Sequence, residues 1–117
     1  MKLVTAIVRP EKLDELIDTV IAHKGRGLTA TTVRGFGQQF GDLLAQPDID
    51  GVPRSRRAVL LTKVRLDILV ADHDAEAMVD AIAWHARTGA IGDGKIWTSD
   101  VDSVRRVRTS ERDDDAL

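Results

Sequence analysis

The sequence predicts a single α+β domain of the ferredoxin-like kind, in which a split βαβ-βαβ chain forms a four-stranded antiparallel sheet with two helices on one face. Three observations lead to this prediction. Short β-branched runs predict strands, two stretches with a helical apolar period predict helices, and a long loop separates two strand-helix-strand units. The 117 residues, 43% of them hydrophobic, fit one compact domain over residues 1–117.

The first half of the chain holds the first unit. Residues 3–8 form a nearly continuous apolar run that predicts a strand, and Pro10 stops it. A helix is expected from residue 11 to Gly25, because apolar residues recur at helical spacing: Leu13, Leu16, Ile17, Val20 and Ile21. Residues 28–34, rich in Thr and Val, predict the second strand.

The second half repeats the pattern after a long irregular segment. Residues 35–61 lack a sustained period, and a connection of this length is usually functional or disordered. Residues 60–70 then alternate as a strand with one apolar face, made of Val64, Leu66, Ile68 and Val70. A second helix is expected over residues 75–86, with Asp72 or Asp74 available as N-cap, and a fourth strand over 95–98. One sheet face is left uncovered in this fold, and self-association is one way to cover it.

Composition excludes several classes of function. A formal net charge of -2 and 3% aromatic residues argue against a nucleic-acid binder. The chain has no cysteine and its three histidines form no close pair, so a zinc site is not expected. The apolar run at the N-terminus is too short for a signal peptide or a membrane span. We therefore expect a cytoplasmic protein without membrane insertion.

The segment Thr-Gly-Ala-Ile-Gly-Asp-Gly-Lys at residues 88–95 is the most informative in the chain. Three glycines free the backbone to present N–H groups to an anion, and Lys95 adds a positive charge, so the segment suggests a phosphate site. It is not a Walker A loop, because Ile96 stands where that motif has Ser or Thr. A tight turn before an edge strand is the alternative.

A second basic group lies near the end of the chain. Arg105, Arg106 and Arg108 are close in sequence, and Arg106 and Arg108 would share one side of an extended chain. Paired guanidinium groups suit the oxygens of a polyphosphate. The alternative is a solvated basic patch offset by the acidic residues of positions 111–115.

Five blocks of the sequence together resemble the nitrogen regulatory P-II proteins in identity, order and approximate spacing. They are Gly-Leu-Thr at 27–29, Val-Arg-Gly-Phe-Gly-Gln-Gln at 33–39, Lys-Val-Arg-Leu-Asp at 63–67, residues 88–95, and Val-Arg-Thr at 107–109. The resemblance spans nearly the whole chain except the long loop. It implies a flexible T-loop at 35–61, a phosphate-binding B-loop at 87–95 and a C-terminal segment at 104–117.

The resemblance also implies a homotrimer in which ATP and ADP compete for clefts between subunits. Each implied role falls on particular residues. The nucleotide would be held by Thr29, Gly37, Gln38, Asp67, Leu69, Gly92, Asp93, Gly94, Lys95 and, from the neighbouring subunit, Arg106 and Arg108. Gln39 would hold Mg²⁺ through the nucleotide, and Gln39 with Lys63 would bind 2-oxoglutarate. The T-loop would dock on a target enzyme or a membrane transporter, such as an ammonium transporter.

This chain departs from the family pattern at several positions. Gln38 replaces an arginine that touches the terminal phosphates, and Ala90 replaces a lysine. The preference for ATP over ADP or AMP is therefore open. A divergent sensor of AMP, ADP or bicarbonate, which would regulate a membrane transporter or carbon metabolism, is the alternative function. The chain has no tyrosine, which excludes the tyrosyl nucleotidylylation known in many relatives.

Two further classes of function compete with the regulator. An enzyme, such as a slow ATPase, is not expected, because no general base or nucleophile pair accompanies the phosphate loop. A purely structural trimer or a metal-binding relative of the fold would leave Lys95 and the two arginines unexplained. We interpret Trp84 and Trp97 as packing or interface residues rather than ligand platforms, because each lies in a predicted regular element.

Overall fold

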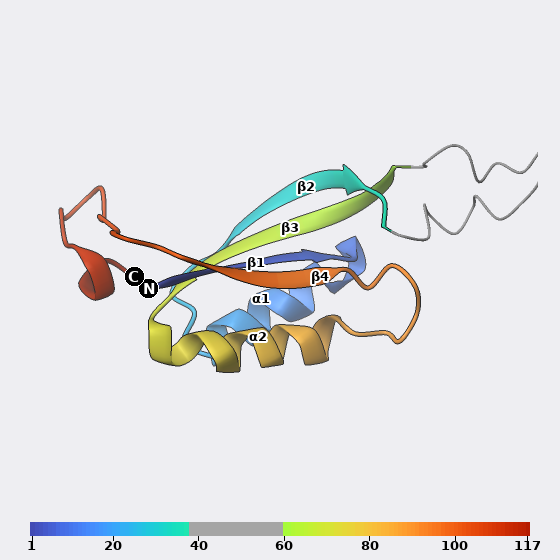
Figure 1. Cartoon of the computed structure of the whole chain (residues 1–117), viewed down its shortest axis with the longest axis horizontal. Coiled ribbons are helices and arrows are strands. Elements are labelled where there is room, and N and C mark those ends of the chain that lie inside the picture. Colours follow the sequence, from blue (N-terminus) through green and yellow to red (C-terminus); the bar gives the residue numbers. More distant parts are fainter. Residues whose placement is uncertain (38–59) are drawn as a thin grey trace, which may run out of the picture.

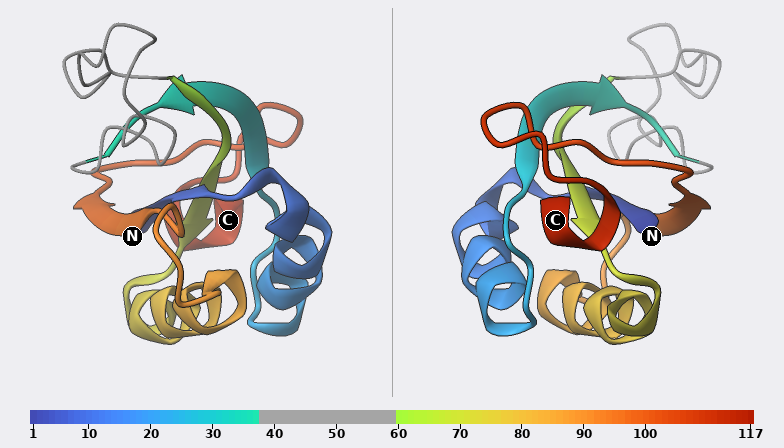
Figure 2. Two further views of the ribbon diagram at one scale, coloured as in Figure 1. Left: turned by 90° about the vertical axis from the view of Figure 1, so that its right-hand side faces the viewer. Right: turned by 90° about the vertical axis from the view of Figure 1, so that its left-hand side faces the viewer.

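The computed structural model of the chain describes residues 1–37 and 60–117. Four strands form one antiparallel sheet in the order β2-β3-β1-β4. The strands are β1 (Lys2–Val8), β2 (Thr29–Gly35), β3 (Leu61–Val70) and β4 (Lys95–Asp100), and the helices are α1 (Leu13–Ala22) and α2 (Asp72–Ala86). Both helices cover the same face of the sheet (Figures 1 and 2). The predicted α+β ferredoxin-like fold is confirmed.

The core lies between the sheet and the two helices. In β3 the buried side chains alternate as predicted, since Val64, Leu66, Ile68 and Val70 are buried and the residues between them are half-buried or exposed. These side chains meet Leu16 and Val20 from α1 and Met78 and Ile82 from α2 in one apolar cluster. The helical period of the sequence therefore places its apolar stripe on the sheet.

The helix boundaries differ from the expected ones for local reasons. Pro10 opens a short 3-10 turn (Pro10–Lys12), so α1 starts at Leu13 instead of residue 11. The expectation that Asp72 or Asp74 caps α2 is wrong. Ala71 is the N-cap and makes no side-chain cap bond, while Asp72 is the first helical residue and its carboxylate accepts a hydrogen bond from the Met1 amino group at 2.7 Å.

Neither α1 nor α2 covers the opposite face of the sheet (Figures 1 and 2). Arg65, Asp67 and Leu69 of β3 point to this face, which we call the open face, because neighbouring residues in a strand face opposite ways. Leu69 is 38% exposed and Trp97 of β4 is 45% exposed. Within the part of the chain that the structure describes, no helix is long and apolar enough to cross a membrane.

The strand order also brings the ends of distant segments together. β1 and β4 are antiparallel neighbours in which Ile7 pairs with Lys95, so the end of β1 lies beside the loop that precedes β4. This loop and the ends of β2 and β3 that flank residues 38–59 lie toward the same end of the molecule (Figure 1). The C-terminal segment lies at the other end.

Candidate functional site

A hollow of about 740 Å³ opens beside the loop that precedes β4. Three segments far apart in the sequence supply most of its walls, namely the end of β2, the start of β3 and the loop itself, and residues of β1 and β4 complete them. The lining residues are Ile7, Val33–Gly37, Leu61, Lys63, Arg65, Ala90–Lys95 and Trp97. Four of them carry a positive charge and one, Asp93, a negative charge, so the hollow suits an anion.

Asp93 organises the loop from inside. Its carboxylate accepts hydrogen bonds from the backbone N–H of Thr88 at 2.8 Å and of Gly89 at 2.9 Å, and also from the Thr88 hydroxyl. These bonds, led by the one from the Thr88 hydroxyl, hold the pKa of the Asp93 carboxyl far below its usual range. The carboxylate of Asp93 is thus occupied by hydrogen bonds within the loop. A ligand beside the loop would therefore bind its backbone groups and not this side chain.

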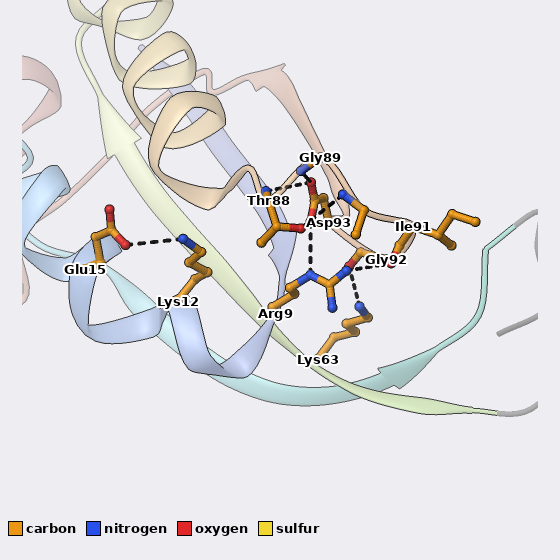
Figure 3. Close-up of polar contacts among 10 residues, drawn as sticks. Arg9, Lys12, Glu15, Lys63, Thr88, Gly89, Ile91, Gly92 and Asp93 are labelled. Atoms are coloured by element: carbon orange, nitrogen blue, oxygen red, sulfur yellow. Dashed lines mark hydrogen bonds and ion pairs between the residues drawn. The ribbon is translucent and has the colours of Figure 1, made fainter. Parts of the chain in front are cut away.

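Arg9, at the end of β1, holds the same loop from its other side. Its Nε donates to Asp93 Oδ1 at 3.0 Å and its Nη2 donates to the carbonyl oxygen of Ile91 at 2.6 Å (Figure 3). One planar guanidinium group therefore connects two points of the loop, which a lysine could not do with the same geometry. Sequence reasoning missed Arg9. The antiparallel pairing of β1 with β4 was the signal that could have found it, because this pairing puts the end of β1 beside the start of β4.

Lys63 reaches the loop from β3. Its Nζ donates a hydrogen bond to the carbonyl oxygen of Gly92 (Figure 3). A ligand carboxylate that pairs with Lys63, as the sequence predicts for 2-oxoglutarate, would compete with this carbonyl for the ammonium group. Lys63 and Arg9 together hold adjacent carbonyl groups of the loop, those of Gly92 and Ile91.

The glycines of the loop are required by its backbone. Gly89, Gly92 and Gly94 have φ angles of 86°, 102° and 100°, which L-residues rarely adopt. Gly94 also lies against β1, where a Cβ atom would stand only 1.7 Å from the carbonyl oxygen of Ile7. The predicted freedom of the backbone is therefore used at all three positions.

The hollow brings together six of the residues predicted for ligand binding: Gly37, Lys63, Gly92, Asp93, Gly94 and Lys95. Gln38 and Gln39 lie outside the described residues, as does most of the predicted T-loop. Ala90 lines the hollow with a methyl group, and its N–H donates to the Thr88 hydroxyl at 3.2 Å.

Three further residues predicted to hold the nucleotide, Thr29, Asp67 and Leu69, lie on the open face and are not among the residues that line the hollow. Thr29 pairs with Asp67 across β2 and β3, and Leu69 follows two residues later. Asp67 accepts hydrogen bonds from Arg65 Nε at 2.9 Å and from Thr5 Oγ1 at 2.9 Å. The bond from Arg65 is the main cause of the lowered pKa of Asp67.

The C-terminal segment, which carries the two arginines predicted for the phosphates, lies at the far end of the molecule from the loop (Figure 1). The chain is not extended there, because the Ser110 N–H donates to the carbonyl of Arg106 at 2.8 Å and closes a turn. The alternation that would put Arg106 and Arg108 on one side of an extended chain therefore does not apply here. Arg106 donates to Glu111 Oε1 at 2.9 Å and to the Leu117 carbonyl oxygen at 3.0 Å.

Comparison with known proteins finds one family that matches nearly the whole chain. The family model described as nitrogen regulatory protein P-II matches residues 1–111. Nitrogen regulatory protein P-II 2 of Methanothermobacter thermautotrophicus is 43% identical over 111 residues, which cover 95% of this chain and 92% of that protein. The P-II protein of Synechocystis sp. is 42% identical and that of Rhizobium meliloti 39% identical, each over the full length of both chains.

Proposed function

Because the chain belongs to the nitrogen regulatory protein P-II family, we propose that it binds ATP or ADP between the subunits of a homotrimer and reports the bound nucleotide through residues 35–61. P-II proteins are regulatory signal-transduction proteins that act on target proteins, so the chain is a regulator and not an enzyme. The proposed targets are enzymes or transporters of nitrogen metabolism, and the proposed location is the cytoplasm.

One observation carries the nucleotide proposal. The loop of residues 88–94 is held open by Asp93 and Arg9 beside a hollow whose wall includes Lys63 and Lys95. Arg9 balances the charge of Asp93, and Arg65 is paired with Asp67. An anion in the hollow would therefore meet Lys95 and, in exchange for its bond to the Gly92 carbonyl, Lys63. Glycine-rich backbone with adjacent cationic side chains is a typical arrangement for phosphate groups.

The position of Arg106 and Arg108 supports a site between subunits. β4 alone separates Lys95 from Asp100 by about 17 Å at the usual rise of a strand, and the arginines lie beyond Asp100. Within one chain these groups cannot converge on one phosphate chain. A second copy would bring its arginines to the loop of the first and would also cover apolar side chains of the open face such as Leu69.

The proposed Mg²⁺ and 2-oxoglutarate depend on residues at the edge of the hollow. The described residues contain no group of three His, Asp or Glu that could hold a metal by itself. A magnesium ion would therefore be held by the nucleotide phosphates with Gln39, and its charge would offset theirs. Lys63 supplies a cation for a carboxylate of 2-oxoglutarate within the hollow.

Signalling would follow from a shift in population. Gly37 and Leu61, which flank residues 38–59 on either side, both line the hollow. A ligand in the hollow therefore touches both ends of this segment, and it would favour the conformations of the segment that bind it best. Target proteins would distinguish those conformations.

Ala90 favours a second candidate, a sensor tuned to a smaller anion such as AMP, ADP or bicarbonate. Its methyl group lines the hollow where the family resemblance leads one to expect a lysine, so the wall carries one positive charge fewer. The affinity for a ligand with fewer negative charges would fall less from this replacement than the affinity for ATP would.

Calorimetric titrations with ATP, ADP, AMP and bicarbonate, each with and without Mg²⁺ and 2-oxoglutarate, distinguish the two candidates. We expect ATP or ADP to bind a trimer seen by native mass spectrometry. Lys95→Ala should weaken nucleotide binding at least tenfold, whereas Lys24→Gln, which changes an exposed cation that does not line the hollow, should leave it unchanged. A protein that stays monomeric and binds none of these ligands would refute the proposal.

A further inference from the structure

Trp97 is a large apolar side chain that the described part of the chain covers only in part. It is 45% exposed. Its neighbour in β4, Ile96, packs against the core, so alternation directs Trp97 to the open face, away from both helices. The sequence predicts a packing or interface role for Trp97, and packing within one chain covers only part of the ring. Either a second copy of the chain or a ligand would cover the rest.

Trp97 belongs to two groups of residues at once. It lines the hollow together with Gly94 and Lys95. It also pairs across the sheet with Thr5, which in turn pairs with Asp67, the partner of Thr29. Paired residues lie on the same face, so Thr29, Asp67, Thr5 and Trp97 form one row across the open face. Trp97 is thus the member of this row that also borders the phosphate loop.

The hollow combines two chemistries that match the two halves of a nucleotide. Cationic side chains and glycine backbone suit phosphates, while Ile7, Val33 and Trp97 give it an apolar wall. Aromatic side chains stack on nucleobases, and the interaction is tolerant of sequence because every base has a flat π-face.

We propose that the indole ring of Trp97 packs against the purine or ribose of the bound nucleotide and so contributes to the recognition of a nucleoside over a bare polyphosphate. This inference rests on the proposed nucleotide site. Loss of the ring should weaken nucleotide binding by about tenfold, the effect of losing one base-aromatic stack.

The rival role for Trp97 is contact with a second copy of the chain. The two roles differ in their consequences. A ligand-binding ring affects nucleotide affinity and leaves tripolyphosphate, which lacks base and ribose, unaffected. If the ring instead contacts a second copy, its loss changes the assembly and alters the affinity for ATP and for tripolyphosphate to the same extent.

The affinity experiment compares Trp97→Leu and Trp97→Phe with the wild type by calorimetry, using ATP and inorganic tripolyphosphate. We expect Trp97→Leu to lose about tenfold in ATP affinity while tripolyphosphate binding stays the same, and Trp97→Phe, which keeps a ring, to retain most of the ATP affinity. Trp84→Leu on α2 is the matched control and should bind both ligands as the wild type does. Equal ATP affinity in Trp97→Leu and the wild type overturns the inference, as does a change of oligomeric state in native mass spectrometry.

Fluorescence gives a test that does not require the loss of the ring. The chain has two tryptophans and no tyrosine, so Trp84→Phe leaves Trp97 as the one emitter. We expect ATP to change the emission of Trp97 and tripolyphosphate to change it much less. In Trp97→Phe the emission comes from Trp84, and it should stay constant when ATP is added. Unchanged emission from Trp97 in a protein that binds ATP overturns this inference and leaves the proposed function standing. A wild-type protein that binds no nucleotide overturns the proposed function first.

Discussion

Replacement of Gly94 by alanine tests whether the loop before β4 depends on its close approach to β1. In the structure Gly94 has a φ of 100°, and a Cβ atom there would stand 1.7 Å from the carbonyl oxygen of Ile7. Ordinary contact between a methyl carbon and an oxygen is about twice that distance, so β1 and the start of β4 would have to move apart. Ile7 and Lys95 are paired at this point, and the movement would disturb their pairing.

The expected loss of stability has two parts. A non-glycine residue at a positive φ of this size costs about 1–3 kcal/mol, and an extra carbon forced into a packed site costs about 1–3 kcal/mol more. Together we expect the free energy of unfolding to fall by about 4 kcal/mol, or the melting temperature by about 15 °C for a domain of this size.

Two other glycines of the chain are matched controls. Gly89 also has a positive φ, 86°, but a Cβ there meets nothing within 4 Å, so Gly89→Ala isolates the conformational part and should cost about 1.5 kcal/mol. Gly27 has neither a positive φ nor a neighbour within 4 Å, so Gly27→Ala should be neutral or slightly stabilising.

Urea and thermal unfolding, followed by circular dichroism at one fixed protein concentration, measure these differences. The concentration is fixed because assembly would shift the apparent stability. The order of loss should be Gly94→Ala, then Gly89→Ala, then Gly27→Ala. Equal stability of the first two variants would show that contact with Ile7 contributes nothing, and the reasoning from the close approach would be refuted.

Three further predictions concern charged groups. Arg9→Lys keeps the charge but loses the two-point contact with Asp93 and Ile91, so calorimetry should show about tenfold weaker nucleotide binding; unchanged affinity would mean that the loop keeps its shape without the guanidinium. Lys63→Met removes the cation that is predicted to pair with 2-oxoglutarate and should abolish the effect of 2-oxoglutarate on ATP binding; a retained effect would assign that ligand elsewhere. The hydrogen bond with His85, followed by the charge of Lys12, lowers the pKa of Glu15. The ionised carboxylate therefore stabilises the fold at pH values above its ordinary pKa, and this stabilisation is lost as the pH falls through the lowered pKa. Glu15→Gln should therefore flatten the decline of stability between about pH 5 and pH 3 in urea unfolding, and an identical decline in the wild type and the variant would contradict this role.

Sequence by itself determined the elements and their faces. The period-2 pattern of β3 and the 3.6-residue period of α1 predicted which side chains are buried, because these periods follow from local backbone geometry. The glycines of residues 88–94 predicted an unusual backbone, since glycine alone adopts large positive φ without strain. The order of the strands and helices along the chain then predicted a four-stranded antiparallel sheet.

Tertiary structure decided which distant residues meet. Arg9 lies more than 80 positions from Asp93, and only the pairing of β1 with β4 brings them together. The exposure of Trp97 likewise depends on which face the helices cover. Arg106 shows the converse, since a turn closed by Ser110 replaced the extended chain that its sequence pattern suggested. Local periods fix the side on which a residue stands, but strand order and register fix what it touches, and these depend on the packing of the whole chain.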